Sequence, residues 1–266
     1  MPFPAQCEYA AKLGYDGLEI APYTLSEEPH RLGAARVAAA RAAAEDAGIA
    51  LTGLHWLLVK PAGLSISTRD PKTRERTLDV MRALIDLCAE LGGRYLVHGS
   101  PQQRRVEAGD TRAAAMARAQ ECFAAVAERA QRAGVLYCIE PLATEATPLI
   151  NSVEEAARMV DEIASPCVRT MLDCSAAGRM EKEPLGALLE RWLPKGVIAH
   201  VQLNDRNRRG PGQGEQRFAP IFASLKRHRY AGDVAVEPYD YVPDGPGAAA
   251  RAIGYVRGIL EALDEK

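Results

Sequence analysis

Four apolar segments of this chain end in a side chain that carries an oxygen, and this regularity limits its fold more than any other feature. The four residues are Glu140, Asp173, Gln202 and Glu237. Successive members lie about 30 residues apart, which is the length of one strand with its following helix. The carboxyl ends of parallel strands share one edge of a sheet or barrel, where ligands bind. We therefore expect the four side chains at one site.

The remainder of the chain continues this alternation of strands and helices. Seven strands are predicted, near residues 17–22, 49–58, 94–101, 135–141, 168–173, 197–203 and 233–238. Each is followed by a helical pattern, and one further helix precedes the first strand. Segments rich in Val, Ile and Leu are typical of parallel strands that are covered on both faces. No change in composition divides the chain, so we expect a single α/β domain over residues 1–266.

The number of strands favours one barrel architecture. A (β/α)8 TIM barrel closes with eight strands, so the pattern predicts a TIM barrel that lacks its first strand, which would precede the N-terminal helix. An open doubly wound sheet is the alternative. No GxGxxG turn follows the early strands, which argues against it.

Charge and cysteine usage indicate the kind of partner and compartment. The net charge is −2, with acidic and basic residues mixed along the chain, so neither nucleic acid nor an anionic membrane is expected as a partner. The six cysteines form no CxxC pair, and neither a signal peptide nor an apolar run of membrane-spanning length is recognised. We expect a reduced, cytoplasmic protein that binds a small molecule.

The four strand-end residues suit a divalent cation, because such ions take several oxygen ligands from different elements. A single carboxylate at a strand end more often caps a helix or pairs with an arginine. Four residues with side-chain oxygens at the ends of consecutive strands favour a shared site for a metal or a substrate. His200 lies two residues before Gln202 and points the same way. It is interpreted either as a ligand or ligand support, or as a hydrogen-bonded core histidine.

Other polar residues are candidates for binding the substrate. His55 and His98 end neighbouring strands, where they could line the pocket or supply a proton. Glu19 ends the first predicted strand in a similar position. Glu145 lies in a loop that could reach over the pocket mouth. Arg208 belongs to a loop with three arginines, one of which could bind a hydroxyl-rich or anionic ligand.

Several segments resemble the xylose-isomerase-like TIM-barrel superfamily of sugar isomerases and epimerases. They are LGYDGLEI, CIEP, MLD, HVQLND with GPGQGE, and VAVEP. In that family a Glu, an Asp, a His and a second Glu hold one divalent cation, and the resemblance places these ligands on Glu140, Asp173, Gln202 and Glu237. Gln202 departs from the family's histidine, and its amide oxygen favours Mn²⁺ or Mg²⁺ over Zn²⁺. Ala176 stands where the ketose epimerases carry a substrate-binding histidine.

The resemblance implies a metal-dependent isomerase or epimerase that acts on a keto-sugar through an enediolate. Glu140 and Glu237 would be the catalytic carboxylates, and Arg208 matches a substrate-contacting arginine. A metal-dependent keto-sugar lyase or dehydratase and a sugar-binding barrel without catalysis remain alternatives. The superfamily's abasic-site endonucleases need many histidines and a basic cleft, which five histidines and this charge argue against. The sequence neither predicts nor excludes assembly into a homo-oligomer.

Overall fold

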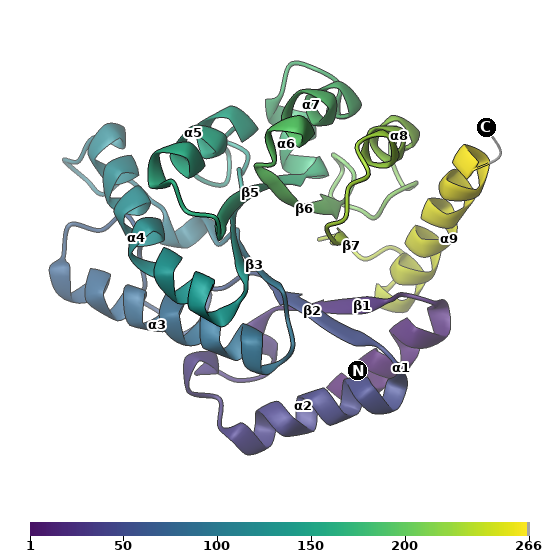
Figure 1. Cartoon of the computed structure of the whole chain (residues 1–266), viewed down its shortest axis with the longest axis horizontal. Helices are drawn as coiled ribbons and strands as arrows, with labels where there is room; N and C mark the ends of the chain where they lie inside the picture. Colours follow the sequence, from purple (N-terminus) through teal and green to yellow (C-terminus); the bar gives the residue numbers. More distant parts are fainter. Residues whose placement is uncertain (265–266) are drawn as a thin grey trace.

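The computed structural model describes residues 1–264, and its strands form one parallel sheet in the order of the sequence. The seven strands are β1 (Gly17–Ile20), β2 (Ala50–Leu54), β3 (Tyr95–His98), β4 (Leu136–Ile139), β5 (Val168–Asp173), β6 (Ile198–Leu203) and β7 (Val234–Val236). Figure 1 shows them around a common centre with the helices outside. The predicted TIM-barrel architecture with seven strands is confirmed, and the barrel is nearly closed.

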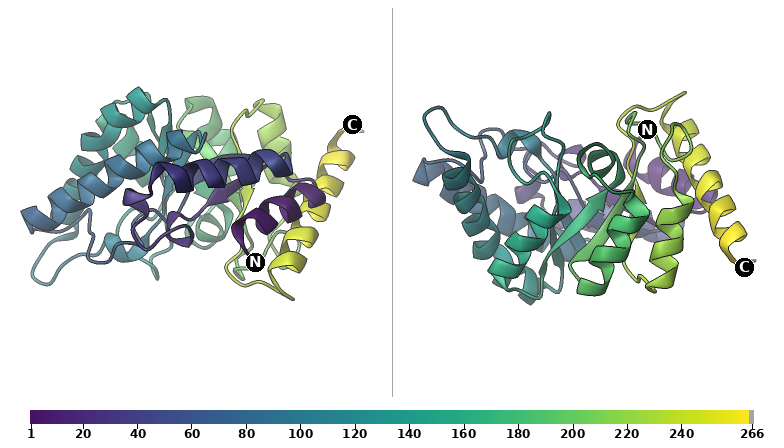
Figure 2. Two further views of the ribbon diagram at one scale, coloured as in Figure 1. Left: turned by 90° about the horizontal axis from the view of Figure 1, so that it is seen from below. Right: turned by 90° about the horizontal axis from the view of Figure 1, so that it is seen from above.

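The helices form the outer layer (Figure 2). They are α1 (Phe3–Leu13), α2 (Ala34–Ala47), α3 (Pro71–Glu90), α4 (Arg112–Ala133), α5 (Val153–Ile163), α6 (Cys174–Met180), α7 (Leu185–Trp192), α8 (Ala219–Arg227) and α9 (Gly245–Asp264). Within residues 1–264, none is both long and apolar enough to cross a bilayer. The sequence pattern does not predict α6, which begins directly after β5 because Asp173 accepts a hydrogen bond from the Ala176 amide and caps it.

Helix boundaries follow from local capping. Asp70 accepts a hydrogen bond from the Thr73 amide at the start of α3, and Pro71 supplies the preset backbone angle of a first helical residue. Thr111 caps α4 in the same way through the Ala114 amide. Gly134 ends α4 at a φ of 70°, a left-handed conformation that glycine adopts without steric cost. These caps determine where α3 and α4 begin and where α4 ends, and both helices pack against the strands.

Because successive side chains of a strand point to opposite faces, the hydrophobic residues form two layers, one on each face of the sheet. Inside the barrel, a small cluster comprises Tyr95, Val97, Cys138 and Met171. The larger core lies between the sheet and the helices, where alternate residues such as Leu96 face outward. The barrel interior is therefore packed with side chains, and polar groups collect where the strands end.

The barrel has a seam between β7 and β1, which do not pair within the described residues. Side chains bridge the gap instead: Nε2 of Gln202 on β6 donates to Oε1 of Glu19 on β1 at 2.7 Å. On the outside, α9 lies beside α1 (Figures 1 and 2), and the Tyr15 hydroxyl donates to the Ala249 carbonyl at 2.8 Å. The position of this seam agrees with a barrel in which one strand next to β1 is absent.

Candidate metal centre and active site

Three carboxylates meet at the carboxyl end of the barrel. One oxygen from each of Glu140, Asp173 and Glu237 lies within 4.8 Å of the other two. Asp173 ends β5, while Glu140 and Glu237 directly follow β4 and β7. All three side chains are buried. Three buried negative charges at this spacing repel one another strongly, so the arrangement suits a bound cation or retained protons.

The pKa values of the group reflect this repulsion. Burial, together with Glu237 and Asp173, raises the pKa of the Glu140 carboxyl well above its usual range. Burial and the neighbouring Glu237 raise the pKa of Asp173 to about 7. Without a cation the group therefore retains protons near neutral pH, and a divalent ion would displace them.

Residues that the sequence analysis did not single out hold these ligands in place. A Cβ atom at Gly99 would lie 1.5 Å from Oε2 of Glu140, so only glycine leaves room for that carboxylate. The buried Arg104 donates to the backbone oxygen of Glu140 at 2.8 Å and to that of His98 at 3.0 Å, which ties the ends of β3 and β4 together. The Asn204 amide donates to Oδ2 of Asp173 at 2.6 Å.

Glu237 is held by aromatic and imidazole donors. Its Oε1 accepts from the Trp56 indole nitrogen at 2.9 Å and lies 2.9 Å from Nδ1 of His55. Its Oε2 lies 3.4 Å from the hydroxyl of Tyr239. Trp56 has a φ of 52°, an uncommon value for a bulky residue that is tolerated where the surroundings enforce it. Of these partners, His55 was a predicted site residue.

Gln202 lies beside Asp173, because the two residues are register partners on β6 and β5. Its Nε2 donates to Glu19, while its Oε1 is buried and has no hydrogen-bond partner among residues 1–264. A buried amide oxygen without a partner is costly, and it is also the atom that a hard cation accepts as a ligand. The donor set of three carboxylates and one amide oxygen therefore fits a divalent metal ion.

Glu19 links two of the predicted histidines. Nε2 of His200 lies 2.8 Å from Oε2 of Glu19, and Nδ1 of His55 lies 3.3 Å from Oε1. The His200 ring stacks on Tyr95 with 4.2 Å between the centroids. Burial raises the pKa of Glu19, but His200 and His55 outweigh it and lower the pKa to about 2. For His55, burial acts in the opposite direction and lowers the pKa. The charge of Glu19 and the contact with Glu237 outweigh burial, so the pKa of His55 lies above its usual value.

His98, a predicted site residue, does not face the carboxylate group. It lies on the outward face of β3, where Nδ1 is 2.8 Å from the Tyr137 hydroxyl and the ring packs edge-on against Phe123 of α4. The inward positions of β3 are Tyr95 and Val97, so the strand's alternation directs His98 toward the helices. Burial, assisted by Arg104, lowers the pKa of His98 well below its usual value and keeps the ring neutral.

The remaining two candidates lie on exposed loops. Glu145 is exposed in the loop after β4. Arg208 is exposed after β6, with its guanidinium carbon 5.1 Å from the centre of the Tyr239 ring and its Nε 3.8 Å from Oδ1 of Asp240. Because Tyr239 also contacts Glu237, Arg208 lies one side chain away from the carboxylate group.

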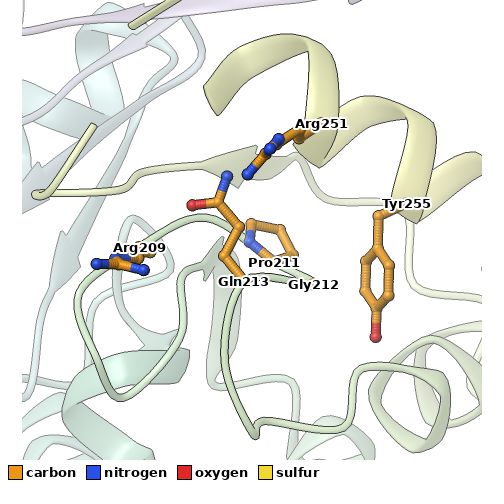
Figure 3. A pocket seen from close by; sticks show the side chains of 6 residues that line it. All are labelled: Arg209, Pro211, Gly212, Gln213, Arg251 and Tyr255. Carbon is orange, nitrogen blue, oxygen red and sulfur yellow. The ribbon is translucent and has the colours of Figure 1, made fainter. Parts of the chain in front are cut away.

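A separate cavity of about 310 Å³ lies between the loop that follows Arg208 and helix α9. Figure 3 shows the side chains that line it, which are Arg209, Pro211, Gly212, Gln213, Arg251 and Tyr255. None of the carboxylates of the candidate metal centre lines this cavity. The cavity therefore lies outside that centre.

The chain resembles several known sugar epimerases. It is 28% identical over 246 residues to D-psicose 3-epimerase of Agrobacterium fabrum, covering 89% of this chain and 79% of that protein. It is 28% identical over 270 residues to D-psicose 3-epimerase of Ruminiclostridium cellulolyticum, covering 97% and 85%. The expected relationship to sugar epimerases is therefore confirmed.

Solved structures and a family comparison agree on the fold. A crystal structure of D-psicose 3-epimerase in the presence of D-fructose superimposes with a TM-score of 0.82 at 21% identity, covering 98% of this chain and 94% of that one. The 3-keto-D-glucoside 4-epimerase of E. coli has a TM-score of 0.81 at 20% identity, covering 96% and 94%. The family model described as xylose isomerase-like TIM barrel matches residues 7–259, and the chain belongs to that family.

Proposed function

We propose that this protein is a metal-dependent keto-sugar epimerase or isomerase whose active site is the carboxylate group at the end of the barrel. The observation that carries the proposal is the convergence of three buried carboxylates within 4.8 Å of one another. Beside them lies the amide oxygen of Gln202, which has no hydrogen-bond partner in the part of the chain that the structure describes. The relatives named as D-psicose 3-epimerases supply the substrate class, a ketose.

In this proposal Glu140, Asp173, Gln202 and Glu237 hold one divalent cation. Oxygen donors suit Mn²⁺ or Mg²⁺ better than Zn²⁺, which more often takes nitrogen and sulfur ligands. The cation would supply positive charge to the carbonyl and hydroxyl oxygens of the sugar and so acidify the carbon-bound proton between them.

Glu140 and Glu237 are proposed to transfer that proton, one on each face of the substrate carbon. The indole of Trp56 and the imidazole of His55 hold Oε1 of Glu237, so the orientation of this carboxylate is fixed before the substrate binds. Removal on one face and return on the other would leave an epimer. The same proton transfer, followed by loss of a hydroxyl group, would make the enzyme a lyase.

Arg208 and Tyr239 are proposed to bind the sugar at the mouth of the site. The cation–π contact between them orients the guanidinium above Tyr239, which contacts Glu237. Ala176, where the ketose epimerases carry a histidine, is buried at the start of α6 and offers the substrate no side-chain donor. The preferred ketose should therefore differ from that of enzymes with the histidine. Cytoplasmic location remains a prediction from the sequence, which does not decide whether the chain assembles into a homo-oligomer.

The test is turnover of a panel of ketoses in D₂O with added Mn²⁺, for the wild type and for Glu237→Gln. We expect the wild type to incorporate deuterium at one carbon and to form the epimer, and the variant to lose about 10²-fold or more in kcat/KM. Glu128→Gln, an exposed position on α4, is the matched control and should retain full activity. Full activity in Glu237→Gln would refute the role of this carboxylate, and elimination products would identify a lyase.

A further inference from the structure

The side-chain amide of Gln202 has two different ends, and only one of them can bind a cation. Its oxygen carries lone pairs, whereas its NH₂ group is a donor and repels a cation. Glutamine as a metal ligand therefore creates a problem of orientation. The amide must be held with Oε1 facing the site, and a rotation of 180° about its last bond would place the NH₂ group there instead.

The carboxylate of Glu19 determines which end of the Gln202 amide faces the site. Its Oε1, on β1, accepts from Nε2 of Gln202 on β6 at 2.7 Å. An ionised carboxylate only accepts hydrogen bonds, so the reversed amide would set Oε1 of Gln202 against a carboxylate oxygen. That arrangement is repulsive, and the observed orientation leaves Oε1 buried and without a partner in the described part of the chain.

The Glu19 carboxylate lies between Gln202 and two histidines. Its second oxygen lies 2.8 Å from Nε2 of His200, whose ring stacks on Tyr95. Its side chain is only 6% exposed, so water has little access to compete for either oxygen. The other oxygen, Oε1, accepts from Gln202 and also lies 3.3 Å from Nδ1 of His55. Because both oxygens face nitrogen atoms, the carboxylate determines which end of the Gln202 amide faces Asp173.

We propose that Glu19 is a positioning residue that selects the amide oxygen of Gln202 as the fourth metal ligand. The inference rests on the proposed function, since it concerns the same cation. It assigns a role to a buried carboxylate that the proton-transfer scheme does not use. It also explains how glutamine can serve as a ligand here, because Glu19 determines which end of the amide faces the cation.

The experiment is a double-mutant cycle on metal affinity, measured by titration calorimetry with Mn²⁺ and no sugar. Glu19→Gln keeps the size of the side chain but allows either end of its amide to face Gln202, so the selection is lost. We expect the Kd for Mn²⁺ to rise about 10- to 100-fold, the range for residues that support metal ligands. Melting in EDTA shows whether the variant remains folded.

The second arm is Gln202→Glu, whose two carboxylate oxygens are equivalent, so no orientation has to be selected. In the double variant Glu19→Gln/Gln202→Glu, the amide at 19 donates to the carboxylate at 202, which restores the hydrogen bond with donor and acceptor exchanged. We expect this double variant to bind Mn²⁺ at least as tightly as the wild type. A merely structural role for Glu19 would instead weaken binding equally in both backgrounds.

The outcomes separate this inference from the proposed function. If the wild type binds Mn²⁺ and Glu19→Gln binds it equally well, the positioning role is refuted while the metal centre stands. If the double variant binds no better than Glu19→Gln, orientation of the amide is not the reason for the loss, and the inference fails. If the wild type binds no divalent ion, the proposed function fails, and the positioning role fails with it.

Discussion

Replacing Gly99 by alanine should disable the metal centre while the barrel stays folded. The added Cβ would lie 1.5 Å from Oε2 of Glu140 and 2.7 Å from its Cδ. Carbon and oxygen atoms need roughly 3.5 Å, so the carboxylate must move by about 2 Å. Ligand oxygens bind Mn²⁺ or Mg²⁺ at about 2.0–2.3 Å, and a shift of this size removes Glu140 from the coordination sphere.

The cost to folding should be much smaller than the cost to function. The atoms in the way are the end of a flexible side chain rather than backbone, and overpacking of this kind costs about 1–3 kcal/mol. At about 2–4 °C per kcal/mol for a chain of this size, Tm should fall by roughly 2–12 °C. A misplacement of about 1 Å at a catalytic group costs roughly 10²-fold in rate, so kcat/KM should fall at least that far.

The assays are metal content after gentle purification, Mn²⁺ titration, ketose turnover, and melting in EDTA. Gly258→Ala is the matched control, since a Cβ at this position on α9 meets no atom of residues 1–264 within 4 Å. It should retain metal and activity, with a stability equal to or above that of the wild type. Wild-type metal content and turnover in Gly99→Ala would refute the placement of Glu140 in the centre.

Three further perturbations test the charge balance and the core. Glu140→Gln should raise the stability of the metal-free protein at about pH 8 by about 1–3 kcal/mol, measured by urea unfolding in EDTA, because a neutral amide avoids the cost of burying the carboxylate beside Glu237 and Asp173 or of taking up a proton there; an equal gain at about pH 4, where the wild-type carboxyl is already neutral, would contradict this. The folded state holds a proton on Asp173 up to a pKa of about 7, while the unfolded chain releases it near 3.8. Metal-free stability should therefore fall as pH rises through this window, and the Tm increase caused by Mn²⁺ should be larger at about pH 8 than at about pH 5; the reverse order would count against a cation at the carboxylates. Leu84→Ala, at a fully buried position on α3, should lose about 2–5 kcal/mol in urea unfolding and keep its metal, whereas loss of metal would place α3 in the site.

The strand order and the group of carboxylates could be predicted from the sequence because both depend on periodicity. A strand that ends in Glu or Asp directs that side chain to one edge of a parallel sheet, and three such strands are enough to predict where Glu140, Asp173 and Glu237 meet. Counting apolar segments predicts seven strands, and the described residues form seven, with a seam between β7 and β1.

Other features were decided only by the tertiary structure, because they depend on which face a residue occupies and on what lies opposite. His98 is the last residue of β3 and His55 directly follows β2, yet the alternation of β3 turns His98 toward Phe123 while His55 contacts Glu237. Gly99 is one glycine among 22 until the Glu140 carboxylate is seen to fill the space beside it.

The pairing of Glu19 with Gln202 joins residues 183 positions apart across the barrel seam. Local propensity therefore determined the elements and the edge at which the oxygens collect. Long-range packing decided the direction of each hydrogen bond at that edge. These bonds join residues far apart in the sequence, which meet only when the strands form the barrel.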